Sequence, residues 1–312
     1  MQDINETTLR KPLLRDHLRL LTAAAIWGST FLLNAVALGD FTPVAIATYR
    51  VLLAAVVICL ICKSMKLPII LDRRSVMLLA AIGLLNSAVP FTLIGWGQLR
   101  IDSATTAILL ASSPFFTLLF SHFMTRDDRF TWPKLMGLIL GFLGVVVLLG
   151  QGISQGSGGF AGMLAVVAAG SCYSMSSLLI RRLKGMPTLL LVAGSLVAAC
   201  VVMVPILLVT SPPWEQSWHL DTAGALAVLA IGPTAIAYVL RAQIVQINGA
   251  VFMSNVGYLI PLFAVFWGWL FLSEKPSIVM WVALGLILAG IAMGQRRTRK
   301  PIAPAESVAR SS

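Results

Sequence analysis

Ten apolar runs divide this 312-residue chain, and each is long enough to cross a lipid bilayer. They lie at about 18–38, 42–62, 75–98, 103–124, 133–150, 160–180, 187–210, 222–246, 250–272 and 277–295. A transmembrane helix needs about 20 mostly apolar residues. Only 11% of the residues are charged, whereas soluble domains carry about 25%. The sequence therefore predicts an all-α integral membrane protein with ten transmembrane helices and no soluble domain of ordinary size.

Basic residues are distributed unevenly between the two sides of these helices. If the amino terminus is cytoplasmic, 20 of the 23 Lys and Arg residues fall on the cytoplasmic side. Arg100 and Lys275 fall on the opposite side, and Arg50 lies inside the second run. Because cytoplasmic loops are enriched in Lys and Arg, this asymmetry places both termini in the cytoplasm. The net charge of +11 is then a topology signal facing an anionic leaflet, and we expect no nucleic-acid partner.

The two halves of the chain share a sequence pattern. Each half has a proline followed thirteen residues later by an acid, and then the tetrapeptide Gly-Leu-Ile-Leu. These elements are Pro114, Asp127 and 137–140 in the first half, and Pro261, Glu274 and 285–288 in the second. Each half has five helices, and because five is odd the halves must be inverted in the membrane. Inverted repeats recur in secondary transporters, where substrate sites lie between the halves.

The repeat divides the chain into four parts. We expect a cytoplasmic tail at 1–17, a first five-helix repeat at 18–150, a second at 160–295, and a basic cytoplasmic tail at 296–312. The Gly/Ser/Gln-rich stretch at 150–159 is expected to connect the repeats.

Several motifs resemble the EamA branch of the drug/metabolite transporter superfamily. The run from Trp27 to Phe31 is similar to the family's Trp-Gly entry in helix 1, and Pro43 followed by Tyr49-Arg50 is similar to the start of its helix 2. The proline helices resemble the carboxyl-terminal pattern of each half. One departure is the Arg126-Asp127-Asp128 run, where the family usually has Gly-Glu. The resemblance implies ten helices in two inverted halves, and export or exchange of metabolites or amino acids across a bacterial inner membrane.

Arg50 is the only ionisable residue that the pattern places well inside a membrane span. Such residues are costly in lipid and are functional candidates. Two interpretations remain open: Arg50 anchors a neighbouring helix, or it binds a substrate carboxylate. All twelve Asp and Glu residues fall in tails, connections or helix ends. Without a deeply buried acid as a proton relay, we expect uncoupled transport or exchange.

Polar and aromatic residues at mid-membrane positions complete the candidate substrate site. Such residues can hydrogen-bond a zwitterion or hold an apolar or cationic group, although they also join membrane helices. The predicted substrate-binding residues are Trp27, Thr30, Asn34, Arg50, Asn86, Ser113, Tyr173, Tyr238, Asn255 and Tyr258. Pro114 and Pro261 are predicted as hinges for alternating access, the alternative being fixed bends that shape packing.

The sequence predicts no enzyme, cofactor or metal site. Cys59 and Cys62 form a C-x-x-C inside an apolar run without a nearby histidine, so they are interpreted as packing residues. We expect a multi-pass protein of the bacterial inner membrane: a secondary transporter, exporting or exchanging an amino acid or a neutral or amphipathic metabolite. The alternative is a membrane scaffold or regulatory protein that transports nothing. Gly141 and Gly144 form a surface of small residues on the predicted helix at 133–150. The sequence leaves open whether this surface packs inside the bundle or forms a homodimer.

Overall fold

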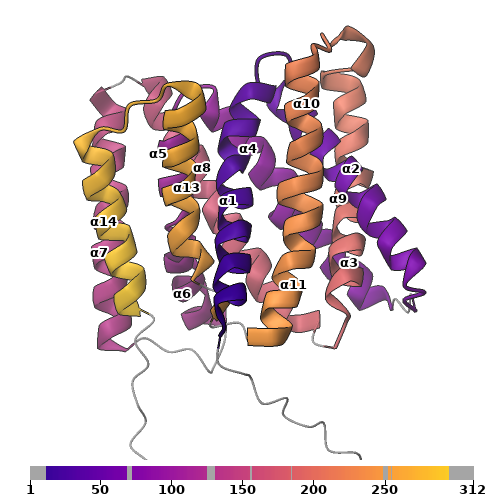
Figure 1. The fold of residues 1–312 in the computed structure, drawn as a ribbon, viewed down its shortest axis with the longest axis horizontal. Helices are drawn as coiled ribbons and strands as arrows, with labels where there is room; N and C mark the ends of the chain where they lie inside the picture. The colour runs from indigo at the N-terminus through magenta and orange to yellow at the C-terminus, as the bar shows by residue number, and fades with distance from the viewer. Residues whose placement is uncertain are drawn as a thin grey trace, which may run out of the picture.

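A computed structural model describes residues 12–68, 72–124, 131–154, 157–183, 185–248, 252–253 and 255–294. Its helices stand side by side, and α1 begins at the same edge of the bundle at which α14 ends (Figure 1). The first half contains α1 (Leu14–Ala37), α2 (Pro43–Ser64), α3 (Arg73–Gly83), η1 (Leu84–Ala88), α4 (Val89–Gln98), α5 (Ser103–Leu110), α6 (Ser113–Met124) and α7 (Trp132–Ser154).

The second half repeats this order. It contains α8 (Ser157–Ile180), η2 (Arg181–Leu183), α9 (Thr188–Thr210), η3 (Pro213–Glu215), α10 (Leu220–Leu229), η4 (Ala230–Ile236), α11 (Ala237–Asn248), α13 (Val256–Leu272) and α14 (Ile278–Gly294). Seven helical columns of the described residues are long and apolar enough to cross a membrane. Three shorter apolar helices, 220–236, 256–272 and 278–294, supply the others. The prediction of ten apolar helices is confirmed.

Helix starts follow from local sequence. Thr42 accepts a hydrogen bond from the Ala45 backbone N–H at 3.2 Å, and Pro43 follows in the first turn of α2. Asp72 accepts one from the Ser75 N–H at 3.1 Å at the start of α3. Both are N-caps that satisfy an otherwise unpaired amide. The connection expected at 150–159 is much shorter, because α7 continues through Ser154 and α8 begins at Ser157.

Packing between the halves follows the repeat. Helix α1 packs on α13 near the end of the second half, and α8 packs on α6 at the corresponding place in the first half. Helix α2 packs on its counterpart α9, and α7 packs on its counterpart α14. The third column of each half also contains one π-helical segment, η1 before Pro90 and η4 around Pro233. Such segments leave backbone groups without their usual helical partners, and they often mark functional sites.

Glycines allow a close contact between α7 and α14. A Cβ atom placed on Gly290 of α14 would overlap backbone atoms of Gly137 and Gly141 on α7, and one placed on Gly144 would meet Ala283. Small residues allow such backbone approach in membranes, where helices associate through packing. The question that the sequence left open for Gly141 and Gly144 is therefore answered: this surface packs inside the bundle.

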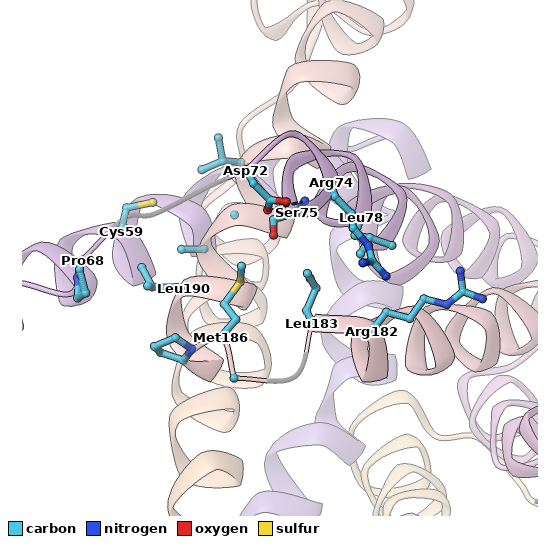
Figure 2. A pocket seen from close by; sticks show the side chains of 15 residues that line it. Cys59, Pro68, Asp72, Arg74, Ser75, Leu78, Arg182, Leu183, Met186 and Leu190 are labelled. Atoms are coloured by element: carbon cyan, nitrogen blue, oxygen red, sulfur yellow. Dashed lines mark hydrogen bonds between the residues drawn. The ribbon is translucent and has the colours of Figure 1, made fainter. Parts of the chain in front are cut away.

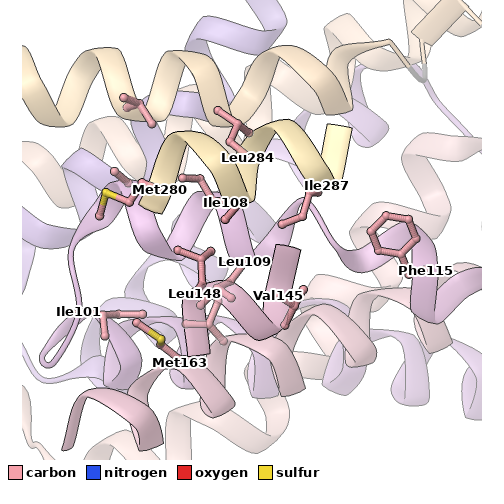
Figure 3. Packing of buried hydrophobic residues seen from close by; sticks show 14 of the residues in the cluster. Ile101, Ile108, Leu109, Phe115, Val145, Leu148, Met163, Met280, Leu284 and Ile287 are labelled. Carbon is pink, nitrogen blue, oxygen red and sulfur yellow. The ribbon is translucent and has the colours of Figure 1, made fainter. Parts of the chain in front are cut away.

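The main apolar core lies next to this contact, between α5, α7, α8 and α14. Figure 3 shows Ile108 and Leu109 facing Leu148 of α7 and Ile287 of α14. All four side chains are fully buried. Large apolar side chains are nevertheless common on the outer surface, as expected for helices that face lipid.

Candidate functional site

Arg50 lies on α2 and is only 7% exposed. Its Nε donates a hydrogen bond to the Thr234 hydroxyl at 2.8 Å, and its guanidinium carbon lies 3.9 Å from the centre of the Phe91 ring. Thr234 belongs to η4 of the second half, and Phe91 follows η1 in the first half. The two irregular segments thus position the partners of one buried cation at the interface between the halves.

This cation has no acidic partner in the described part of the chain: no Asp or Glu there lies within ion-pair distance of Arg50. The phenol groups of Tyr173 and Tyr238 lie close enough to interact with it electrostatically. A buried charge without a counter-charge is costly. The arrangement therefore favours an anionic group that arrives from outside the protein.

A polar chain extends from this region. The Asn86 amide nitrogen donates to the Tyr238 hydroxyl at 3.1 Å, and the Ser176 hydroxyl donates to the Asn86 carbonyl oxygen at 3.1 Å. Asn86 and Tyr238 line a cavity of about 290 Å³. The other lining residues are Ile82, Ile180, Leu183, Met186, Thr188, Leu191, Val192, Ser195, Leu196 and Arg241. An apolar wall with a few convergent polar groups is typical of small-molecule sites.

The cavity reaches the end of the bundle at which α2 ends and α3 begins, which the sequence predicts to be cytoplasmic. Met186 lies in the connection between η2 and α9, and Thr188 lies in the first turn of α9. Thr188 and Arg241 are both exposed. The sequence analysis missed Ser176, Ser195 and Arg241. Arg241 was counted only as a topology signal, and its distance from Asn86 in sequence gave no reason to place the two in one cavity.

The predicted residues of helix 1 make contacts between helices. Trp27 Nε1 donates to the Pro233 carbonyl at 2.9 Å, which ties α1 to the irregular segment η4. Asn34 donates to the Gln98 side chain at 2.7 Å, and Gln98 donates to the Phe31 carbonyl at 3.0 Å. The Thr30 hydroxyl is buried without a hydrogen-bond partner among the described residues. None of Trp27, Thr30 and Asn34 lines the 290 Å³ cavity.

The remaining predicted residues also lie outside this cavity. The backbone carbonyl of Ser113 accepts a hydrogen bond from Ser174 at 2.7 Å, which joins α6 to α8. Asn255 is exposed at the start of α13, and Tyr258 packs against the main apolar core.

The two predicted hinges differ in the structure. Pro114 stands in the first turn of α6, directly after the break between α5 and α6 at residues 111–112. Pro261 lies inside the continuous helix α13. The repeated prolines therefore do not produce repeated breaks.

Polar contacts link the halves at the opposite end of the bundle. Asp40, between α1 and α2, accepts hydrogen bonds from His219 at 2.8 Å and from the Thr222 hydroxyl. Glu274 caps α5, accepting from the Ser103 N–H at 2.9 Å, the Ser103 hydroxyl at 2.8 Å and the Ala104 N–H at 3.2 Å. Both contacts join the two repeats at the end of the bundle opposite the opening of the cavity.

These contacts perturb nearby ionisable groups. The hydrogen bond to Asp40 raises the pKa of His219, and the hydrogen bonds from Thr222 and then His219 lower the pKa of Asp40. Burial, and then the nearby carboxylate of Glu274, raise the pKa of Asp102. Apart from the repeated acid at Glu274, nothing in the sequence predicted either cluster.

Two five-helix repeats, packed around a buried cation and a small cavity with a mainly apolar wall and a few polar groups, define the architecture of a helical transporter. Residues 16–150 and 160–294 each match the EamA-like transporter family. The chain therefore belongs to this family, and its function is transport.

Relatives align over most of their length. The chain is 27% identical to an S-adenosylmethionine/S-adenosylhomocysteine transporter of Chlamydia trachomatis serovar L2, with 86% of this chain and 85% of the relative covered. It is 26% identical to Protein PecM of Dickeya dadantii, covering 91% and 95%. The fold is similar to a crystal structure at a TM-score of 0.65 and 21% identity, covering 90% of this chain and 96% of the other. The expected family and the expected membrane class are confirmed.

Proposed function

We propose that this protein is a secondary transporter that exports or exchanges a small amphipathic metabolite bearing a carboxylate, such as an amino acid. The observation that carries the proposal is Arg50, a buried cation without an acidic partner in the described chain. Arg50 is not one of the residues that line the 290 Å³ cavity, but its charge interacts electrostatically with Tyr238, which does line it. A substrate carboxylate would supply the missing counter-charge.

The rest of the cavity favours an amphipathic molecule. Asn86 and Ser195 offer hydrogen-bonding groups, while Ile82, Leu191 and Leu196 offer apolar surface. The chlamydial relative is named for substrates that each contain an amino-acid group joined to a nucleoside. At 27% identity this supports the amino-acid class and not one compound. Alternating access between the two halves remains the proposed mechanism, with the predicted residues outside the cavity as candidates in other states of the cycle.

Counterflow in proteoliposomes tests the proposal. Vesicles containing purified protein would be loaded in turn with pooled amino acids, S-adenosylhomocysteine, neutral metabolites or a lipophilic cation, and labelled compound added outside. We expect exchange with a carboxylate-bearing pool and little exchange with the amides of the same compounds. Exchange of neutral metabolites and amides alone would contradict the carboxylate assignment. Absence of exchange from every pool, with protein that still melts cooperatively, would favour a scaffold.

Arg50→Gln and Arg50→Lys variants test whether the charge of Arg50 is needed to distinguish a carboxylate from its amide. Arg50→Gln should abolish discrimination between a carboxylate and its amide, while Arg50→Lys should retain part of it because the charge remains. Arg100→Gln is the matched control: Arg100 also lies over an aromatic ring, 3.6 Å from the centre of Trp96, but it is exposed. It should leave discrimination unchanged. Equal discrimination in Arg50→Gln and the unsubstituted protein would exclude Arg50 from substrate recognition.

A further inference from the structure

A second, larger cavity lies at the cytoplasmic end of the first cavity. It has a volume of about 650 Å³ and lies between the carboxyl-terminal part of α2, the start of α3, η2 and the first half of α9 (Figure 2). Its lining residues are Cys59, Pro68, Asp72, Arg74, Ser75, Leu78, Arg182, Leu183, Gly185, Met186, Pro187, Leu190, Ala193, Gly194 and Val197. Leu183 and Met186 also line the smaller cavity, so the two are neighbours.

Two arginines, one from each repeat, contribute to this cavity. Arg74 stands in the first turn of α3 and Arg182 in η2, and both lie on the same side of the cavity in Figure 2. Neither forms a hydrogen bond to a side chain or an ion pair with any residue that the structure describes. Asp72 also lines the cavity, but its Oδ1 accepts the Ser75 N–H and caps α3. The two guanidinium groups are thus available to bind an anion.

The remaining wall is mainly apolar and reaches the lipid-facing surface. Leu78, Leu183, Met186 and Leu190 surround the interior, and Val197 on α9 is 45% exposed among other exposed apolar residues of that helix. A cavity with positive charge at the membrane surface and an apolar wall below it is complementary to a phospholipid. The phosphate of such a lipid lies at the interface, and its acyl chains lie deeper. The cytoplasmic leaflet is rich in anionic lipids, and basic pockets between helices bind their headgroups.

We propose that this cavity binds an anionic phospholipid of the cytoplasmic leaflet, with its phosphate between Arg74 and Arg182 and an acyl chain along Leu190 and Val197. The site is independent of Arg50 and of the identity of the transported substrate. Because Leu183 and Met186 separate the two cavities, the bound lipid forms part of the wall next to the transport cavity.

The test compares two double variants in detergent with added lipid. Arg74→Gln/Arg182→Gln removes the cavity arginines, and Arg73→Gln/Arg181→Gln removes their exposed sequence neighbours, which do not line the cavity. Both variants lose the same charge at the same membrane level. Binding of phosphatidylglycerol and of phosphatidylcholine would be measured by native mass spectrometry and by the rise in Tm. Glycerol 1-phosphate, the free headgroup anion without acyl chains, is the third probe.

We expect phosphatidylglycerol to bind the unsubstituted protein and Arg73→Gln/Arg181→Gln, with phosphatidylcholine much weaker. Arg74→Gln/Arg182→Gln should bind phosphatidylglycerol on the order of 20-fold more weakly, since each basic residue contributes a severalfold gain near an anionic lipid. Its Tm without lipid reports whether it folds. Equal losses in both double variants would overturn the proposal in favour of a general basic surface. An equal response to glycerol 1-phosphate, or no response to phosphatidylglycerol, would also overturn it.

Discussion

At the scale of single residues, Arg50 is held by one hydrogen bond and one aromatic ring. The hydroxyl of Thr234, 1% exposed, both accepts from Arg50 and donates to the Leu229 carbonyl at 3.1 Å. Leu229 lies five positions before Thr234, which is the i to i−5 spacing of a π-helix, so the hydroxyl reaches a carbonyl near the start of η4. The irregular segment therefore helps to orient the hydroxyl that binds the cation.

Replacing Thr234 with Val should destabilise the protein. The substitution keeps the shape of the side chain but leaves Arg50 Nε without its partner, and an unsatisfied buried polar group costs about 1–3 kcal/mol. Thermal unfolding in detergent measures the effect. Thr210→Val is the control, because Thr210 is exposed and bonds only its own helix, to the Ile206 carbonyl. Equal loss of stability in both variants would show that Thr234 does not support Arg50.

His219 and Asp40 predict a pH dependence of stability. The folded pKa of His219 is raised, so its contribution is complete below its ordinary pKa of about 6.5 and is lost as pH rises through the folded value. The lowered pKa of Asp40 gives a contribution that is lost only as strongly acidic pH is approached. The nearby Asp221 adds to the raised value at His219.

We therefore expect Tm to fall between about pH 6 and pH 8, and His219→Gln to reduce this fall. Both groups lie at the solvent-exposed end of the bundle, so the change should be small. His17→Gln serves as the control, since in the described part of the chain the ring of His17 hydrogen-bonds the Leu13 carbonyl of its own helix end and contacts the ring of Phe252. An unchanged fall in His219→Gln would mean that the contact between Asp40 and His219 does not stabilise the folded protein.

Residue identity selected some residues of the candidate site and not others. Arg50, Asn86, Tyr173 and Tyr238 could be selected because polar groups at membrane depth need a partner or a wet cavity, and of these four Asn86 and Tyr238 line the cavity. Asn34 met the same criterion, yet its partner is Gln98 on α4. A single sequence shows that a buried amide needs a partner, but not which helix provides it.

At the scale of secondary-structure elements, the contact between α7 and α14 depends on glycine. Gly290→Ala should destabilise the protein by about 1–3 kcal/mol, because the new methyl group would overlap the Gly137 backbone. Gly285→Ala on the same helix is the control: its Cβ would meet nothing within 4 Å, and alanine favours the helix by up to about 1 kcal/mol. In thermal unfolding, Gly285→Ala should have a higher Tm than Gly290→Ala. The reverse order would show that the two helices do not approach through glycine.

The cap that Glu274 forms on α5 predicts a second effect on stability. Its carboxylate binds two backbone N–H groups at the start of α5, where the helix dipole favours negative charge. Glu274→Ala should cost about 1–2 kcal/mol, and Glu274→Gln less, because the amide oxygen can still accept. Glu215→Ala, at an exposed position in η3, is the comparison. Unfolding temperatures that do not separate Glu274→Ala from Glu215→Ala would argue against this cap.

Element boundaries were largely predictable, whereas their irregularities were not. The lengths of the apolar runs and the positions of the basic clusters place all ten helical columns. The bilayer imposes both patterns, because it sets the length of a spanning helix and the side on which basic loops lie. The π-helical segments η1 and η4 were not foreseen, although Pro90 and Pro233 lie at them. Proline indicates that a backbone donor is missing. Whether the chain then breaks, as before Pro114, or continues, as at Pro261, depends on neighbouring helices.

At the scale of the whole molecule, the repeat explains why a cavity can open to one side at a time. In the described residues, the cavity beside Asn86 reaches the end of the bundle that we predict to be cytoplasmic, while Asp40 and Glu274 join the halves at the other end. Two structurally similar halves can exchange these roles. With the predicted orientation, we propose that the structure corresponds to a cytoplasm-facing state of the cycle.

The most direct test of this account is the accessibility of the cavity to a membrane-impermeant thiol reagent. The four native cysteines, Cys59, Cys62, Cys172 and Cys200, would first be replaced. Asn86→Cys then places a thiol at a partly exposed position in the lining of the 290 Å³ cavity. Ser112→Cys is a buried control, 1% exposed, that lines neither described cavity.

We predict that the reagent labels Asn86→Cys from the cytoplasmic side, that the compound active in counterflow slows this labelling, and that Ser112→Cys stays unlabelled. Protection by that compound would link the cavity to transport. An unlabelled Asn86→Cys in folded protein, or labelling that the transported compound leaves unchanged, would contradict a central cavity that opens to the cytoplasm and holds the substrate.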